Sequence, residues 1–155
     1  SPEAAESFAG CLVDWFQRHD VTPVFLSGMP AERDGAPSLY GISTGEGATL
    51  LDAADVSVPT ESGAITGPTG ALVHEAQRVG LTSVGLVVEA DPQFPDPEAA
   101  GVLLDAGIAP LVDVEVDTAT LAEQAEEIRQ TKAQLAQQMQ GGGEESTSAR
   151  PLGFQ

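Results

Sequence analysis

The stretch TSVGLVVEA, residues 82–90, constrains the fold more than any other part of the chain. Nearly all of it is apolar, without the polar–apolar alternation of a strand that has one face in water. A strand of this kind is covered on both faces, as strands are inside a parallel sheet. The sequence therefore predicts an α/β fold in which this strand belongs to a mostly parallel sheet.

Shorter strands and helices are predicted around this strand. The expected strands are Thr22–Gly28, Ser38–Ser43 and Asp55–Pro59, the last one short or at an edge, and the expected helices are residues 1–19, 47–54, 66–80 and 96–107. Ser1 and Asp96 each precede a proline, a pattern typical of a helix cap followed by proline in the first turn. The alternation of strands and helices indicates the α/β class.

The sequence changes in character after Asp113. A long helix is predicted from about Thr118 to Gln140, with an apolar seam in which Leu121, Ile128 and Leu135 recur every seven residues. Ala125 and Met139 extend this seam, and Lys132 interrupts it. Such a narrow seam packs either on its own domain or on a partner helix, and the sequence favours neither alternative.

The sequence divides into a domain and a tail. Residues 1–140 are expected to form the α/β domain, residues 141–150 a flexible linker rich in Gly and Ser, and residues 151–155 a docking tail. Leu152 and Phe154 are apolar residues that follow the polar linker and lie close to the terminal carboxylate. The alternative is that this apolar end arose by chance.

The charge of the chain limits its partners. There are 24 Asp and Glu residues against 6 Lys and Arg, which gives a formal net charge of −18. Nucleic acids and anionic membrane surfaces are poor partners for such a surface. An acidic surface with a single lysine is typical of halophilic proteins, in which molar salt screens self-repulsion, although an ordinary acidic cytosolic protein is the alternative. The single cysteine, Cys11, favours a reducing, cytoplasmic location.

Two glycine-rich loops could carry chemistry. GISTG, residues 41–45, matches the nucleophile elbow of hydrolases, and His74 is the only histidine that follows Ser43. TGPTG, residues 66–70, precedes a helix and could hold an anion on backbone N–H groups, but it lacks the lysine of a nucleotide loop. An enzyme of unassigned reaction that uses one of these loops is the alternative function.

An acidic turn follows the apolar strand. Asp91, Asp96 and Glu98 could suggest a hard cation, but the prolines among them favour a stiff turn and Asp96 is already explained as a helix cap. We therefore predict no metal, no cofactor and no catalytic set.

The order of three blocks resembles the archaeal branch of the proteasome assembly chaperone family. The blocks are YGISTGEGATLL, then GAITGPTGALVHEAQRVGLTSVGLVVEADPQFPDPEAAGVLL, then VDVEVDTATLAEQAEEI, and together they cover about Val21 to Gln130. The residues that carry the resemblance are Gly67, Gly70, Glu75, Asp91, Pro92, Asp96 and Pro97. Members of that family also have an N-terminal portion with strands of its own, so the chain is similar to the C-terminal part of the family domain.

The resemblance implies a three-layer α/β/α domain, similar to nucleoside phosphorylases but without their active site. It also implies self-assembly, and docking on proteasome core-particle α-subunits through a C-terminal hydrophobic–tyrosine–any-residue tripeptide. Here the chain ends in Gly153, Phe154 and Gln155, with Phe in place of Tyr and the hydrophobic Leu152 displaced by one position. The expected function is that of a non-enzymatic proteasome assembly chaperone or proteasome-binding protein that acts as a homo-oligomer.

Overall fold

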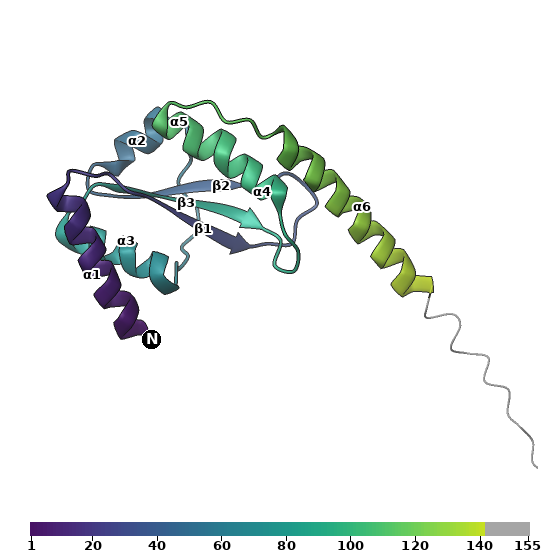
Figure 1. Cartoon of the computed structure of the whole chain (residues 1–155), viewed down its shortest axis with the longest axis horizontal. Coiled ribbons are helices and arrows are strands. Elements are labelled where there is room, and N and C mark those ends of the chain that lie inside the picture. The colour runs from purple at the N-terminus through teal and green to yellow at the C-terminus, as the bar shows by residue number, and fades with distance from the viewer. Residues whose placement is uncertain (142–155) are drawn as a thin grey trace, which may run out of the picture.

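The computed structural model describes residues 1–141, which form a small three-stranded sheet with helices on both faces (Figure 1). The strands are β1 (Val24–Pro30), β2 (Leu39–Thr44) and β3 (Ser83–Ala90). The helices are α1 (Pro2–Arg18), α2 (Gly47–Ala53), α3 (Gly67–Val79), α4 (Pro97–Val102), a π-helical segment η1 (Leu103–Ile108), α5 (Ala109–Val112) and α6 (Ala119–Gly141). The mixed α/β class predicted from the sequence is confirmed.

The sheet has the order β1-β3-β2, which places the apolar strand at its centre. β1 pairs with β3 in parallel, but β2 pairs with β3 antiparallel. A mostly parallel sheet is therefore not confirmed. The reason lies in the connection from β1 to β2, because parallel strands need a long crossover and only a short loop without a helix joins these two.

The predicted strand at Asp55–Pro59 is wrong, because this stretch follows α2 without forming a ladder. The backbone N–H of Gly41 donates to the carbonyl oxygen of Ser57 at 2.8 Å, and Val56 is buried. The segment is thus held against β2 by one backbone hydrogen bond and by apolar packing.

Two apolar clusters hold the helices on the sheet, one on each face. The first joins α1, α3 and β1, and the second joins α2 to β3 and to the residues after α2. The buried members of the first are Ala9, Val13, Phe25, Leu72 and Ala76, and those of the second are Leu51, Ala54, Val56, Val84 and Leu86. On β3, Val84 and Leu86 are buried on one face and Ser83 and Gly85 on the other, so burial of β3 on both faces is confirmed. Each large apolar side chain buried in these clusters stabilises the fold by roughly 1.5–3 kcal/mol.

Glycines allow α2 to lie very close to the sheet. A Cβ atom on Gly41 would stand 2.4 Å from Cδ2 of Leu51, and one on Gly47 would stand 2.2 Å from the carbonyl oxygen of Ser83. Between them, Gly45 has a positive φ of 55° in the turn that leads from β2 into α2. The glycines around the GISTG stretch are therefore accounted for by packing and by the turn.

The long helix α6 lies against the domain at its start and extends away from it at its end (Figure 1). Ala125 is buried, and Leu121 and Ile128 are half-buried on the side of α4. Leu135 is 45% exposed and Met139 is exposed as well. The first half of the predicted seam thus packs on its own domain, and the second half does not. Among the described residues, no helix combines the length and apolar character needed to cross a bilayer.

Candidate functional site

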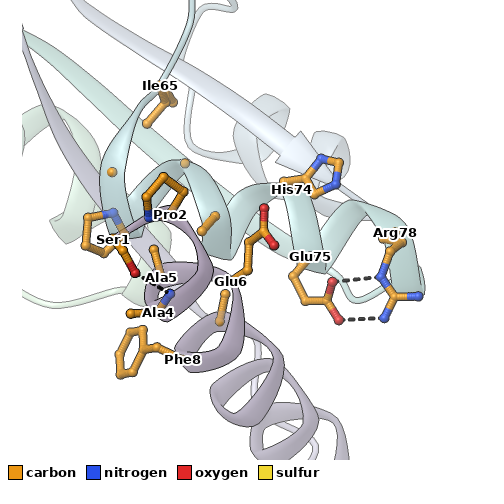
Figure 2. A pocket seen from close by; sticks show the side chains of 15 residues that line it. Ser1, Pro2, Ala4, Ala5, Glu6, Phe8, Ile65, His74, Glu75 and Arg78 are labelled. Atoms are coloured by element: carbon orange, nitrogen blue, oxygen red, sulfur yellow. Dashed lines mark hydrogen bonds and ion pairs between the residues drawn. The ribbon is translucent and has the colours of Figure 1, made fainter.

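A groove of about 1240 Å³ runs between α1 and α3 (Figure 2). The TGPTG stretch, residues 66–70, lines one end of it through Gly67 and Gly70. Phe8 and Pro2 of α1 line it together with Ile65 and Pro68, which precede and begin α3. His74, Glu75 and Arg78 stand along α3 at the other end. The wall is therefore mostly apolar, and Ser1 and Glu6 add polar groups to it from the side of α1.

The TGPTG loop owes its two glycines to backbone geometry. Gly67 has a φ of 69°, in the left-handed region that favours glycine. A Cβ on Gly70 would stand 2.1 Å from the carbonyl oxygen of Ile65, so only glycine lets the incoming chain fold back over the first turn of α3. Gly67 and Gly70 thus fix the start of α3 and one end of the groove.

Glu75 forms a bidentate ion pair with Arg78 one turn later on α3. The Nε and one terminal nitrogen of Arg78 donate to the two carboxylate oxygens at 2.7 and 2.6 Å. These hydrogen bonds hold the pKa of Glu75 below its usual value. Glu75 therefore stays ionised at the rim of the groove.

Ser43 and His74, the two residues of the hydrolase alternative, are not brought together. Ser43 pairs with Val84 and faces α2, where its Cβ would approach a side chain at Gly47. His74 is exposed on α3, which covers the opposite face of the sheet. Ser43 also lies within β2, whereas a nucleophile elbow requires the serine in the turn itself.

The acidic turn after β3 is held by its own carboxylates. The Oδ1 atom of Asp91 accepts hydrogen bonds from the N–H groups of Gln93 at 2.8 Å and Phe94 at 3.0 Å. Asp96 caps α4 by accepting from the N–H of Ala99 at 3.0 Å, and its other oxygen accepts from the N–H of Asp91 at 2.8 Å. The cap predicted at Asp96 is confirmed, with Pro97 in the first turn of α4 and Pro92 in the preceding turn.

Arg33 completes this turn from the loop after β1. Its terminal nitrogens bond both oxygens of Asp96 at 2.8 and 3.0 Å, in a largely buried pair. Burial acts to raise the pKa of Asp96, but the hydrogen bonds from Arg33 and from two backbone amides leave it lowered overall. The two loops that meet here follow the carboxyl ends of the parallel strands β1 and β3.

The helix α6 adds two more cations to the acidic turn. Lys132 pairs with Oδ2 of Asp91 and lies 4.9 Å from the centre of the Phe94 ring, while Arg129 reaches Glu98 at 3.5 Å. The hydrogen bond from Lys132 is the main cause that lowers the pKa of Asp91 to about 2. The lysine that interrupts the apolar seam therefore anchors α6 to the domain.

Half of the six basic residues of the chain, Arg33, Arg129 and Lys132, gather at this turn. Within residues 1–141, no group of three His, Cys, Asp or Glu side chains is arranged to hold a metal ion. Sequence reasoning missed Arg33 and Arg129. The available signal was that the carboxyl ends of parallel strands meet at one edge, which places the loop containing Arg33 beside the acidic turn.

The predicted docking residues Leu152, Gly153, Phe154 and Gln155 lie outside the described residues, as does the predicted linker beyond Gly141. Gly141 itself is the last residue of α6.

The comparisons agree with the resemblance seen in the sequence. A model of the PAC2 family matches residues 1–136. Pyrococcus furiosus PbaA, described as an archaeal homolog of proteasome-assembly chaperone, has a TM-score of 0.76 and 25% identity over 94% of this chain and 61% of its own. P. furiosus PbaB, an archaeal proteasome activator, has a TM-score of 0.73 and 23% identity over 87% of this chain and 59% of its own. A PAC2 family protein from Streptomyces avermitilis has a TM-score of 0.67 and 22% identity over 84% and 57%.

This chain spans about three fifths of the PbaA chain. No curated protein sequence matches it. The family match extends over both motif regions, the start of α3 and the acidic turn, and over most of α6. The chain belongs to the PAC2 family.

Proposed function

We propose that this chain is a non-enzymatic proteasome assembly chaperone or proteasome-binding protein. It docks on the α-subunits of the proteasome core particle through C-terminal tails presented by a homo-oligomer. The observation that carries the proposal is the PAC2 match over residues 1–136, together with the likeness to PbaA at 25% identity. Because the chain spans only part of PbaA, the role of the whole relative is here part of the proposal.

The placement of α6 supports a tail-docking function. The helix has 23 residues and is about 35 Å long. Arg129 and Lys132, near its middle, fix it to the domain, and its last residues lead directly to the proposed linker and tail. A helix anchored in this way fixes the point at which each tail starts. Several tails can then reach one target from defined positions on the assembly.

The apolar residues at the end of α6 support self-assembly. Leu135 and Met139 continue the seam beyond the part that packs on α4, and both are exposed. We propose that this second half contacts another copy of the chain. The seam thus serves both alternatives that the sequence left open, with its first half inside the domain and its second half between copies.

Affinity arithmetic explains why an oligomer is needed. Burial of one Phe side chain contributes roughly 1.5–3 kcal/mol. A contact of the terminal carboxylate with a basic group adds about 1 kcal/mol. Millimolar binding already requires about 4 kcal/mol, so a single tail binds weakly. Several tails on one assembly gain from effective concentration.

The enzyme alternative has less support. Ser43 and His74 lie on opposite faces of the sheet, and the glycines of both loops are accounted for by turns and close packing. No observation on either loop favours a reaction.

A pull-down of core-particle α-subunits tests the proposal. The full chain is compared with a chain that lacks Gly153, Phe154 and Gln155, at equal concentration and salt. We expect the full chain to retain α-subunits and the truncated chain to lose them, with unchanged thermal unfolding in both. Equal retention by the two chains would remove the tail from the mechanism, and no retention by either would remove the proteasome as a partner.

A further inference from the structure

The groove between α1 and α3 leaves apolar side chains of both helices open to solvent within residues 1–141. Phe8 is 52% exposed, and Pro2 and Pro68 are exposed as well. Ile65 is half-buried beside them. Exposed apolar patches that are rimmed by polar groups mark interaction sites. The groove is therefore suited to bind a segment with apolar side chains.

The groove also carries a carboxylate that a positive charge could pair with. Glu75 is already paired with Arg78. Glu6 is exposed and forms no ion pair with any residue that the structure describes. Figure 2 shows its side chain directed from α1 toward α3. A segment that complements this groove should therefore combine apolar groups with one cation.

The segment ARPLGFQ, residues 149–155, has this combination and lies outside the described residues. Arg150 is the only basic residue that follows α6. In an extended chain alternate side chains point to the same side, so Arg150, Leu152 and Phe154 would share one face. A residue that precedes proline favours extended backbone, and Pro151 follows Arg150. One face of the segment thus matches the groove in both polarity and charge.

The dimensions of the segment and of the groove agree. From Arg150 to Phe154, an extended chain covers about 13 Å. Along α3, the ten residues from Pro68 to Arg78 rise by about 15 Å. Phe154 can therefore lie at the apolar end of the groove while Arg150 lies beside Glu6.

The position of α6 favours a tail from another copy of the chain. The helix packs on α4, which continues into η1 and the second apolar cluster, whereas the groove lies on the face of the first cluster. Its end extends away from the domain (Figure 1). The exposed second half of α6 is proposed above to contact another copy, so each tail starts beside a neighbouring copy.

We propose that the groove between α1 and α3 binds residues 149–155 of a neighbouring copy and withholds them from the proteasome. The inference rests on the proposed function, since it concerns the same tail and the same homo-oligomer. The tail of one copy meets the groove of the next, and such a heterologous contact links copies into a closed ring or an open chain. The apparent affinity of the tails for any other target falls with the fraction of tails that the grooves hold.

Backbone amide shifts of the full chain test the contact. The wild type is compared with the Phe154→Ala and Arg150→Glu variants at equal concentration and salt. We expect the amides of Ala71 and His74, which line the groove, to shift in both variants, while those of the central strand β3 stay unchanged. Equal shifts at the groove in all three chains would overturn the proposal.

A mixture shows which copy supplies the tail. Isotope-labelled Phe154→Ala chains are combined with an excess of unlabelled wild type. The groove amides of the labelled chains should return to the wild-type positions, because tails of wild-type copies then occupy their grooves. Labelled chains that keep the shifts of the variant would overturn the contact between copies.

A charge reversal tests the role of Glu6. The matched control for Glu6→Lys is Glu3→Lys, which makes the same charge change at an exposed residue of α1 that does not line the groove. Glu6→Lys should shift the groove amides as the tail variants do, and adding Arg150→Glu should restore them. Equal shifts of these amides in Glu6→Lys and Glu3→Lys would overturn the proposal.

Binding to core particles separates this inference from the proposed function. Glu6→Lys releases tails and should raise the affinity for core particles by about two- to fivefold, whereas Glu3→Lys should not. If no chain binds core particles but the groove amides respond as expected, the proposed function fails and the contact between tail and groove stands. If core particles bind all these chains equally and the groove amides do not respond, the contact fails and the proposed function stands.

Discussion

The buried ion pair between Arg33 and Asp96 should be the costliest of the described ion pairs to break. The two side chains are only 14% and 11% exposed, and the Nε of Arg33 is buried without a partner among the described residues. Arg33→Met keeps most of the aliphatic volume but leaves the Asp96 charge without its counterion. Breaking a buried pair in this way costs roughly 3–5 kcal/mol. At roughly 2–4 °C per kcal/mol for a domain of this size, the melting temperature should fall by roughly 6–20 °C.

The matched control is Arg78→Met, which breaks the bidentate pair with Glu75, whose arginine is 62% exposed. An exposed pair of this kind contributes little to stability, because solvent and salt screen it. Both variants are unfolded by heat and by urea at pH 7 and constant salt. Adding Asp96→Asn to Arg33→Met should recover part of the loss, because no unpaired charge is then buried. A loss for Arg33→Met no larger than that for Arg78→Met would refute the claim that the buried Arg33–Asp96 pair is the costliest of the described ion pairs to break.

Three further predictions concern pH, α6 and salt. The pKa of Asp91 is lowered to about 2, and that of Asp96 is lowered as well. Both therefore lie below the value of about 3.9 in the unfolded chain. The stability that these two carboxylates contribute is complete above about pH 4 and is lost as the pH falls from about 4 toward 2. Lys132→Met should flatten this loss in urea titrations at stepped pH, and an unchanged slope would contradict it. Ile128→Asp should lower the free energy of unfolding, because Ile128 packs on its own domain. Leu135→Asp should leave that free energy unchanged and reduce the mass measured by sedimentation, because Leu135 is exposed. A wild-type chain that sediments as a monomer at high salt would contradict the proposed homo-oligomer. With a net charge of −18, self-repulsion should weaken the fold below about 0.1 M salt, where the Debye length exceeds about 10 Å. The melting temperature should therefore rise from dilute buffer to molar KCl, and a flat curve would count against a halophilic design.

The central strand was predictable because its signal is local and strong. An unbroken apolar run has to be covered on both faces, and Val84 and Leu86 on one face and Ser83 and Gly85 on the other are all buried. The direction of β2 was not predictable from its own residues, since it depends on the length of the connection to β1 and on the insertion of β3 between the two.

The GISTG stretch shows why a short motif misleads. Its glycines fit a nucleophile elbow as a pattern, but Gly41 is needed because Leu51 packs against it, and Gly45 because the turn has a positive φ. One cause is a tertiary contact and the other is a backbone conformation, and a five-residue pattern reveals neither.

At the acidic turn, the sequence predicted the local part of the site and missed the long-range part. Asp96 was predicted as a cap from the proline that follows it. Its pair with Arg33 and the pair of Asp91 with Lys132 join residues far apart in the sequence, and they depend on the parallel pairing of β1 with β3 and on the docking of α6.

The affinity for isolated proteasome core particles, measured for the wild-type chain, three point variants and a chain extended at its C-terminus, tests the proposed function most directly. Phe154→Ala should weaken binding by about 10- to 150-fold per tail, since burial of a Phe is worth roughly 1.5–3 kcal/mol. A chain extended beyond Gln155 keeps Phe154 but displaces the terminal carboxylate, and it should bind as poorly as the Phe154→Ala variant. Phe154→Tyr and Gly153→Leu should preserve or improve binding. An affinity that is the same for the wild-type chain, the Phe154→Ala variant and the extended chain would contradict docking through the tail.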